Sequence, residues 1–245
     1  MSTPAAIDAI AGATPVERLR ALRAAVPGRI VFTTSFGIED QAITHLIATA
    51  GLDFELATLD TGRLFPETYE LWDRTEARYG RRIRAFQPDR DALEAYVGSN
   101  GVNGFYNSIE LRQACCAIRK VEPLGRALAG AEAWVTGLRA DQSGDRGAVA
   151  LAAWDAEYRL VKVAPLFDLS RDQVVAFAEA EHVPISPLHA KGFTSIGCAP
   201  CTRAIAPGED ERAGRWWWEQ GAKECGLHVD GSGRLVRDDD ARAAA

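Results

Sequence analysis

The chain has 245 residues, of which 47% are hydrophobic and 25% are charged, and its net charge is −6. This composition is typical of a globular protein with one sizeable α/β domain or two small ones, and no run approaches the roughly 18 apolar residues of a membrane span. An acidic chain argues against nucleic acid as the main partner, although a local basic pocket for a small anion remains open. The first 22 residues lack a basic segment followed by an apolar stretch, and Asp8 and Glu17 interrupt them, so we expect no signal or transit peptide and a cytoplasmic protein.

Helix and strand patterns alternate through the first hundred residues. Pro15 and Pro66 each suit the first turn of a helix. Short apolar, β-branched runs that end in glycine or polar residues read as strands. The pattern predicts helices over 15–25, 38–47, 66–79 and 92–97, and strands over 29–34, 54–59 and 82–86.

The second half continues the alternation with longer loops. Residues 108–129 read as one helix with a break near Pro123, followed by a strand over 133–138 and a polar loop over 139–147. Segments 149–152 and 159–163 form either a hairpin or a strand and an edge, and 170–181 is a capped helix. We therefore predict an α/β fold, a mostly parallel twisted sheet with helices on both faces, and a disordered tail over 230–245.

Three loops follow predicted strands, and ligands bind beyond the carboxyl ends of strands in open parallel sheets. They are Ser35-Phe36-Gly37, Asp60-Thr61-Gly62 and the segment from Gly137 to Gly147. The first leads into a helix, whose free N–H groups favour an anion, and Gly37 allows close backbone approach. A turn that serves only packing is the alternative.

The five cysteines are an odd number in a chain without an export signal, so a disulfide scaffold is a poor explanation. Cys115 and Cys116 are adjacent, and Cys198 and Cys201 form a C-x-x-C pair among glycine and proline. Adjacent cysteines rarely suit zinc, whereas neighbouring thiolates can bind different irons of one cluster. The alternative for the adjacent pair is two small buried hydrophobic residues. The spacing favours a four-cysteine metal site and one separate thiol, Cys225.

Cys225 lies between possible cations, Lys223 and His228, which would lower the pKa of its thiol and raise its reactivity. A cysteine without function is the alternative. Upstream, Arg212 and Arg215 are three residues apart in the segment 207–218, so we expect them on one face of a helix where they can bind an anion. Solvated surface arginines are the alternative there.

Several motifs together resemble the adenylyl-sulfate and phosphoadenylyl-sulfate reductases, a branch of the PP-loop nucleotide-binding superfamily. The resemblance covers about residues 28–229. It rests on TTSFGIEDQ at 33–41, LDTGRLFPETYEL at 59–71, the cysteine pair before Arg119 and Lys120, CAPCTR at 198–203, and ECGLH at 224–228. It implies a PP-loop fold over 1–229, with residues 202–229 as a C-terminal lid.

The four-cysteine pattern resembles the cluster-containing branch of that family. This implies a [4Fe-4S] cluster on Cys115, Cys116, Cys198 and Cys201, adenylyl sulfate as substrate, and thioredoxin as electron donor to an S-sulfonate on the nucleophile Cys225. Lys120 would lie between cluster and substrate. The expected substrate-binding residues are Ser35, Phe36, Gly37, Leu59, Thr61, Lys120, Gly137, Arg139, Arg146, Arg212, Arg215 and His228.

Other functions remain open from the sequence. One is the same reaction on 3′-phosphoadenylyl sulfate. Another is a PP-loop thiolase acting on RNA, although Ser35 to Asp40 replaces the usual S-G-G-x-D-S loop and the chain is acidic. A third is a nucleotide-binding, cluster-based redox sensor. The sequence also leaves open whether the protein forms a homo-oligomer.

Overall fold

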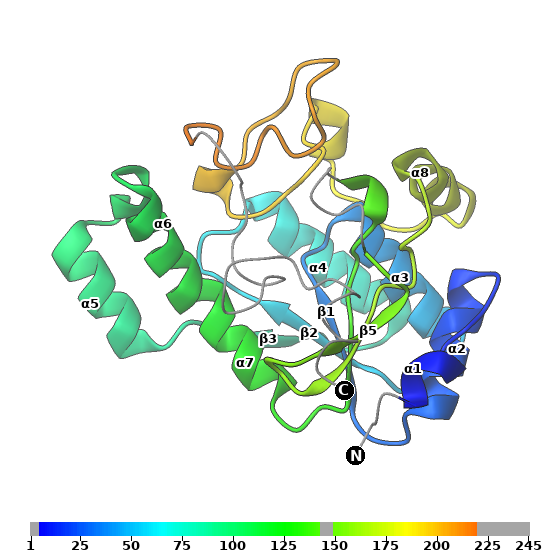
Figure 1. Cartoon of the computed structure of the whole chain (residues 1–245). Coiled ribbons are helices and arrows are strands. Elements are labelled where there is room, and N and C mark those ends of the chain that lie inside the picture. The colour runs from blue at the N-terminus through cyan, green and yellow to red at the C-terminus, as the bar shows by residue number, and fades with distance from the viewer. Residues whose placement is uncertain (1–4, 143–148, 220–245) are drawn as a thin grey trace.

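A six-stranded sheet forms the centre of the computed structural model, which describes residues 5–142 and 149–219 (Figure 1). Its strands are β1 Ile30–Thr34, β2 Glu55–Leu59, β3 Arg84–Phe86, β4 Ala133–Val135, β5 Ala152–Asp155 and β6 Leu160–Val163. Across the sheet the order is β3-β2-β1-β4-β6-β5. All neighbours pair in parallel except β5, which pairs antiparallel with β6 at one edge. The predicted mostly parallel α/β sheet is confirmed.

Eight α-helices connect the strands among the residues that the structure describes. They are α1 Ala5–Ala9, α2 Pro15–Ala25, α3 Ile38–Thr49, α4 Pro66–Tyr79, α5 Arg90–Asn100, α6 Ile109–Cys116, α7 Glu122–Leu128 and α8 Arg171–Ala180. Side-chain caps explain where several of these helices begin. Thr14 and Ser170 form capping boxes, and the side chains of Asp89 and Ser108 accept hydrogen bonds from backbone N–H groups. None of these helices is long and apolar enough to cross a membrane.

Alternating side chains of the strands build a core on each face of the sheet. In β1, Ile30 and Phe32 join the cluster that includes Leu22 of α2, Ile43 of α3 and Val174 of α8. The residue between them, Val31, and Trp134 of β4 instead join Leu124 and Leu128 of α7. A strand buried on both faces has no polar side, which is why the sequence shows short apolar runs at these positions.

The helix expected over 108–129 differs in detail. α6 ends at Cys116, a π-helical segment η2 follows over Ala117–Val121, and α7 begins at Glu122 with Pro123 in its first turn. Proline lacks an N–H group, so its tolerated place is the start of a helical segment. The chain therefore continues through Pro123, and the irregularity lies just before it, directly after the adjacent cysteines.

Other boundaries also shift. The strand expected over 133–138 ends at Val135, and the next residues, Thr136 to Leu138, instead line a cavity. The cap at Asp89 extends α5 to Arg90–Asn100, and α1 was not predicted. The two open alternatives for 149–163 resolve as a β5–β6 hairpin. The helix expected over 207–218 is wrong: these residues form turns, with Arg215 in an isolated bridge to Thr202.

β1 lies between β2 and β4, and the chain order reverses direction there. At such a switch point the loops after neighbouring strands separate, and a ligand can enter beyond their carboxyl ends. The fold thus brings the loops after β1, β2 and β4 to one edge of the sheet.

Candidate active site

A cavity of about 200 Å³ opens at this switch point. It is lined by the loops that follow β1, β2 and β4, by residues 194–198 and by part of the segment 202–219, here named the C-terminal segment. Of the predicted substrate-binding residues, those that line the cavity are Ser35, Phe36, Gly37, Leu59, Thr61, Lys120, Gly137, Arg212 and Arg215. The topology therefore gathers side chains from distant parts of the sequence around one hollow.

The turn after β1 is held by a buried carboxylate. Asp40 accepts hydrogen bonds from the backbone N–H of Ser35 at 2.6 Å and from its hydroxyl at 2.7 Å. Phe36 adopts a φ of 61°, unusual for a residue with a side chain, and its ring stacks on Trp72 with centroids 5.6 Å apart. Burial raises the pKa of Asp40 to about 6, although the bonds from Ser35 oppose this shift.

Gly137, directly after the β4 turn, packs against the same carboxylate. A Cβ atom at this position would overlap Asp40 Oδ1. Glycine is required here because the β4 loop and the β1 turn approach each other closely. The loops after β1 and β4 therefore pack directly against each other, and Ser35 and Gly137 both line the cavity.

Arg139 lies beneath the cavity and is fully buried. Its guanidinium binds Glu39 at 2.9 Å and Glu211 at 2.9 Å, and it lies 3.4 Å from Asp141. Glu39 and Glu211 line the cavity, so Arg139 neutralises carboxylates that would otherwise repel an anion there. The structure places Arg139 in this ion-pair cluster and not among the cavity-lining residues.

The C-terminal segment crosses the open side of the cavity. Glu211 binds Arg139, Thr202 forms a bridge with Arg215, and the N–H of Trp216 donates to the carbonyl of Cys201. Arg215 is buried, and a Cβ at Gly197 would overlap its guanidinium. These contacts place Arg212 and Arg215 at the cavity by tertiary pairing, without the helix that their spacing suggested.

Four cysteines gather beside this cavity. Cys116, Cys198 and Cys201 are buried and form one cluster with Phe105 and Trp216, and Cys115 packs against it partly exposed. One pair comes from the end of α6 and the other from the 3₁₀ turn η6, Ala199–Cys201, which lies far away in the sequence. The fold therefore brings the two predicted ligand pairs together.

Burial, nearby cations and neighbouring cysteines act against one another on the pKa values of these thiols. Burial acts to raise the pKa of Cys198, but Lys120, the Thr61 hydroxyl, Arg215 and Arg119 outweigh it and lower that pKa. The Thr61 oxygen lies 3.2 Å from the sulfur. Burial and the neighbouring cysteines instead raise the pKa of Cys201 to about 12. Sulfurs this close repel one another as thiolates unless something positive lies among them.

The donor set fits an iron–sulfur cluster. Among the described residues, no three His, Cys, Asp or Glu side chains converge on a point that could hold a single metal ion. A cluster does not need that, because each thiolate binds a different iron. Arg119 Nε and Trp216 Nε1 are also buried in the described structure without an acceptor, and both residues line the cysteine pocket. Donors of this kind are satisfied by an electron-rich group such as cluster sulfur.

Lys120 joins the two pockets. It lines the cysteine pocket and the large cavity, as do Cys198 and Trp216. Lys120 belongs to the π-helical segment that follows the adjacent cysteines. Such segments recur at functional sites because one extra residue per turn re-aims side chains. Here the local irregularity accompanies a lysine that borders both pockets.

A family model for the phosphoadenosine phosphosulfate reductase domain matches residues 29–204. The chain belongs to this reductase family. An adenosine 5′-phosphosulfate reductase from Agrobacterium fabrum is 55% identical over 210 residues, which cover 85% of this chain and 81% of the relative. Another from Allochromatium vinosum is 54% identical over 200 residues, covering 81% of this chain and 78% of that one. The resemblance drawn from the motifs is confirmed.

The fold agrees with a solved member of the reductase family. The phosphate complex of phosphoadenylyl-sulfate (PAPS) reductase from Candida auris has a TM-score of 0.67 and 27% sequence identity, over 78% of this chain and 90% of that one. The yeast FAD synthetase in complex with FAD shares the fold at a TM-score of 0.51 and 19% identity, over 82% of this chain and 66% of that one.

Three predicted site residues of this reductase-family chain lie outside the described residues. They are the nucleophile Cys225 and the substrate-binding residues Arg146 and His228. Their roles stay predictions. The expected lid, 202–229, is described only as far as Glu219, and its opening also stays a prediction.

Sequence reasoning missed several residues that shape this reductase site. Asp40 lay inside a quoted motif, but an acidic residue in the first turn of a helix ordinarily indicates only a favourable helix dipole. The ion pairs of Arg112, Glu211 and Glu219 could not be predicted, because their partners are distant in sequence. Glu219 directly follows the three tryptophans, and that unusual run was the only pointer to it.

Proposed function

We propose that the protein reduces adenosine 5′-phosphosulfate to sulfite, with release of AMP, in the assimilation of sulfate. The observation that carries this proposal is the meeting of two pockets at Lys120: a cavity at the nucleotide end of the sheet and a four-cysteine pocket beside it. The identity of 49–55% to relatives named adenosine 5′-phosphosulfate reductase supports the same substrate.

Cys115, Cys116, Cys198 and Cys201 hold a [4Fe-4S] cluster in this proposal. When bound, the cluster supplies a fixed local field and a link between α6 and η6. The protein's own residues prepare that place: Arg119 and Trp216 offer buried N–H groups, and Lys120 supplies a positive charge toward the cavity.

Binding uses the cavity walls and its cations. The adenosine lies along Ser35, Leu59 and Gly137, and the sulfate faces Lys120, Arg212 and Arg215. Arginine recognises oxyanions with paired N–H donors, and three cations offset the charge of the phosphate–sulfate anhydride. Arg139 keeps Glu39 and Glu211 neutralised so that these carboxylates do not repel the substrate.

The Cys225 thiolate attacks the sulfate sulfur. A bond forms between the two sulfurs, the bond from sulfur to the bridging oxygen breaks, and AMP leaves with that electron pair. The product on the protein is an S-sulfonate, a covalent intermediate that divides the reaction into two easier steps. The cations at the cavity hold the sulfate and stabilise the charge on the departing phosphate.

A small dithiol protein of the thioredoxin class completes the cycle. Its first thiolate attacks the Cys225 sulfur, sulfite leaves, and its second thiol resolves the mixed disulfide, so Cys225 returns as a thiol. The donor loses two electrons and the sulfate sulfur gains them. Thiol donors of this class act in reducing compartments, which supports a cytoplasmic location.

The test is a single-turnover reaction with anaerobically purified protein. Iron and sulfide are measured per chain, adenosine 5′-phosphosulfate is added without reductant, and the modified peptide is read by mass spectrometry. We expect one sulfonate group on Cys225 and one AMP per active chain, and sulfite only after a reduced dithiol protein is added. A cluster-loaded protein that stays unmodified and releases no AMP contradicts the proposal.

The same chemistry on 3′-phosphoadenylyl sulfate is the second candidate. The matching family model and the Candida auris structure both carry that substrate in their names. Comparing kcat/KM for the two nucleotides decides between them, because an added 3′-phosphate needs its own cationic partner. We expect the higher kcat/KM with the substrate that lacks the 3′-phosphate.

A further inference from the structure

A buried ion pair ties the end of the C-terminal segment to the helix that carries the adjacent cysteines. Arg112 Nε donates to Glu219 Oε1 at 2.9 Å, and its Nη2 donates to Glu219 Oε2 at 2.8 Å. The side chains of Arg112 and Glu219 are only 2% and 4% exposed. Two parallel bonds fix both the distance and the orientation of the carboxylate. Glu219 therefore has one defined position on the body of the protein.

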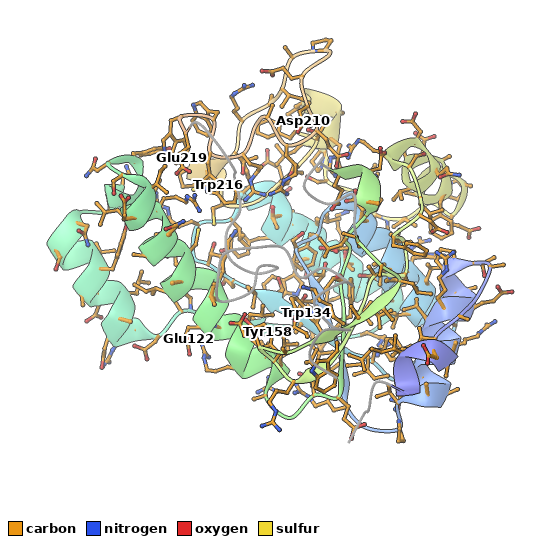
Figure 2. The ribbon with its side chains drawn as sticks, viewed as in Figure 1. Glu122, Trp134, Tyr158, Asp210, Trp216 and Glu219 are labelled. Atoms are coloured by element: carbon orange, nitrogen blue, oxygen red, sulfur yellow. The ribbon has the colours of Figure 1, made fainter. Side chains whose placement is uncertain are left out.

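The surroundings of this pair show that it is built into the site. Arg112 precedes Cys115 by one turn of α6 and also hydrogen-bonds Cys116. Its guanidinium lies over the ring of Trp216, 4.8 Å from the centroid. Figure 2 shows Trp216 and Glu219 close together at the upper end of α6.

A contribution to the free energy of unfolding is a poor explanation for this buried ion pair. Removing two charges from water costs about as much as their attraction returns, so an apolar pair of the same size is often equally stable. What the ionic pair adds is direction, because only one arrangement satisfies both N–H groups and both oxygens. The C-terminal segment also contains the pair Arg203 with Glu209, with bonds of 2.8 and 2.9 Å, but that pair is open to solvent and joins residues six positions apart within the segment, so it ties the segment to no other element.

The position of Glu219 matters for Cys225. Cys225 follows Glu219 by six residues, and six residues span at most roughly 20 Å. Because Glu219 has a fixed position, the thiol of Cys225 can reach only points within about that distance of Glu219. A smaller, correctly placed volume raises the effective concentration of the thiol at the bound sulfate.

We propose that Arg112 and Glu219 are positioning residues: the pair fixes the point from which the chain continues toward Cys225, and thereby the rate at which that thiol attacks bound substrate. This inference rests on the proposed function, since it assigns the pair to the sulfonation step. Neither Arg112 nor Glu219 is among the residues that line the large cavity, so in this inference they act through the chain that follows Glu219.

The test uses the full-length, cluster-loaded protein and the variants Glu219→Gln and Glu219→Asp. Glutamine keeps the shape but cannot accept both charged bonds, and aspartate keeps the charge on an arm shorter by one methylene. Glu209→Gln removes the carboxylate of the exposed pair and serves as the matched control. Four quantities are measured: the first-order rate of Cys225 sulfonation at saturating adenosine 5′-phosphosulfate, the dissociation constant of that nucleotide, iron per chain, and the rate of Cys225 alkylation by iodoacetamide without substrate.

We expect sulfonation to slow about 10- to 100-fold in Glu219→Gln and by a smaller factor in Glu219→Asp. Nucleotide affinity, iron content and alkylation stay within about twofold of wild type, because binding residues and intrinsic thiol reactivity are unchanged. Glu209→Gln matches wild type throughout. A purely structural pair would lower affinity and iron content together with the rate.

Two results overturn the positioning role while leaving the proposed function intact. One is sulfonation at the wild-type rate in Glu219→Gln. The other is a loss of rate in both Glu219 variants that follows loss of iron or of nucleotide affinity. Absence of any sulfonation in the wild-type protein is a different result, which overturns the proposed function and this inference with it.

Discussion

Acidic side chains in the cavity wall would repel an anion unless nearby groups offset their charge. Glu39, Asp40 and Glu211 all line it. Arg139 neutralises the first and the third by direct pairing. Asp40 is handled differently, because burial raises its pKa to about 6 while its oxygen still accepts from Ser35. Pairing with Arg139 thus makes the negative charge facing a ligand smaller than the residue types suggest.

The raised pKa of Asp40 predicts a specific dependence of stability on pH. Its folded pKa of about 6 lies above the ordinary value of 3.8, so the folded state binds more protons between these values. The contribution of this group is present below about pH 4 and is lost as pH rises through about 6. Relative to Asp40→Asn, the wild type should lose roughly 2–3 kcal/mol of unfolding free energy across that window. Urea titrations of both proteins at pH 4 to 7 measure it, and parallel curves would contradict the assignment.

The C-terminal segment, residues 202–219, contains neither an α-helix nor a β-strand, so contacts with other elements must fix its position. Its described residues hold their course by ion pairs at two places, Arg139 with Glu211 and Arg112 with Glu219, and by backbone bonds around Cys201 and Gly214. Arg212 and Arg215 lie between the two pairs. Tertiary partners therefore decide the direction of both arginines, which local propensity could not.

Breaking the first of these pairs should weaken both substrate binding and stability. In Glu211→Gln the hydrogen-bonded charge pair with Arg139 is lost, but Arg139 keeps Glu39, so we expect a cost of about 1–3 kcal/mol in unfolding free energy. Because Arg212 follows directly, the dissociation constant for adenosine 5′-phosphosulfate should rise about tenfold. Calorimetric titration with the nucleotide and thermal melts measure the two effects.

The matched control for that experiment is again Glu209→Gln, since Glu209 pairs with Arg203 on the surface of the same segment. Exposed pairs contribute between 0 and about 1 kcal/mol, so both affinity and stability should stay near wild type. If Glu211→Gln binds the nucleotide as tightly as this control, the Arg139–Glu211 pair does not position Arg212.

In the whole molecule, the cysteine pocket brings together two parts of the chain that the β-sheet does not connect. Cys115 and Cys116 end α6, whereas Cys198 directly precedes η6 and Cys201 ends it, after the last described α-helix, α8. A group bound by all four ties these segments together in the folded state only. Such binding adds directly to the free energy of unfolding.

Loss of iron should therefore destabilise the protein. We expect the anaerobic, iron-loaded protein to unfold several degrees above the iron-stripped protein, because the unfolded chain holds no preformed site. Circular dichroism melts of both forms measure the shift. A variant with all four cysteines replaced by serine is the control and should melt alike before and after chelation. Equal melting of the two wild-type forms would argue against a cluster that bridges α6 and η6.

Sequence patterns were enough to predict the class of the sheet, the two cysteine pairs and the loops that follow β1, β2 and β4. Each of these features depends on residues that are close together in the sequence. Strands buried on both faces appear as apolar runs, loops contain glycine, and the spacing of cysteines can be read directly. Even the site residues Ser35, Gly37 and Gly137 follow from loops at strand ends. Features that depend only on neighbouring residues could therefore be predicted from the sequence.

Which charged residues line the cavity and which are buried behind its lining could be seen only in the folded protein. Arg139 and Arg212 look alike in sequence, yet one is buried between Glu39 and Glu211 and the other lines the cavity. The Arg112–Glu219 pair, likewise, joins residues 107 positions apart. The physical reason is that ion pairing depends on distance in space and on desolvation, and neither is encoded in the neighbours of a residue along the chain.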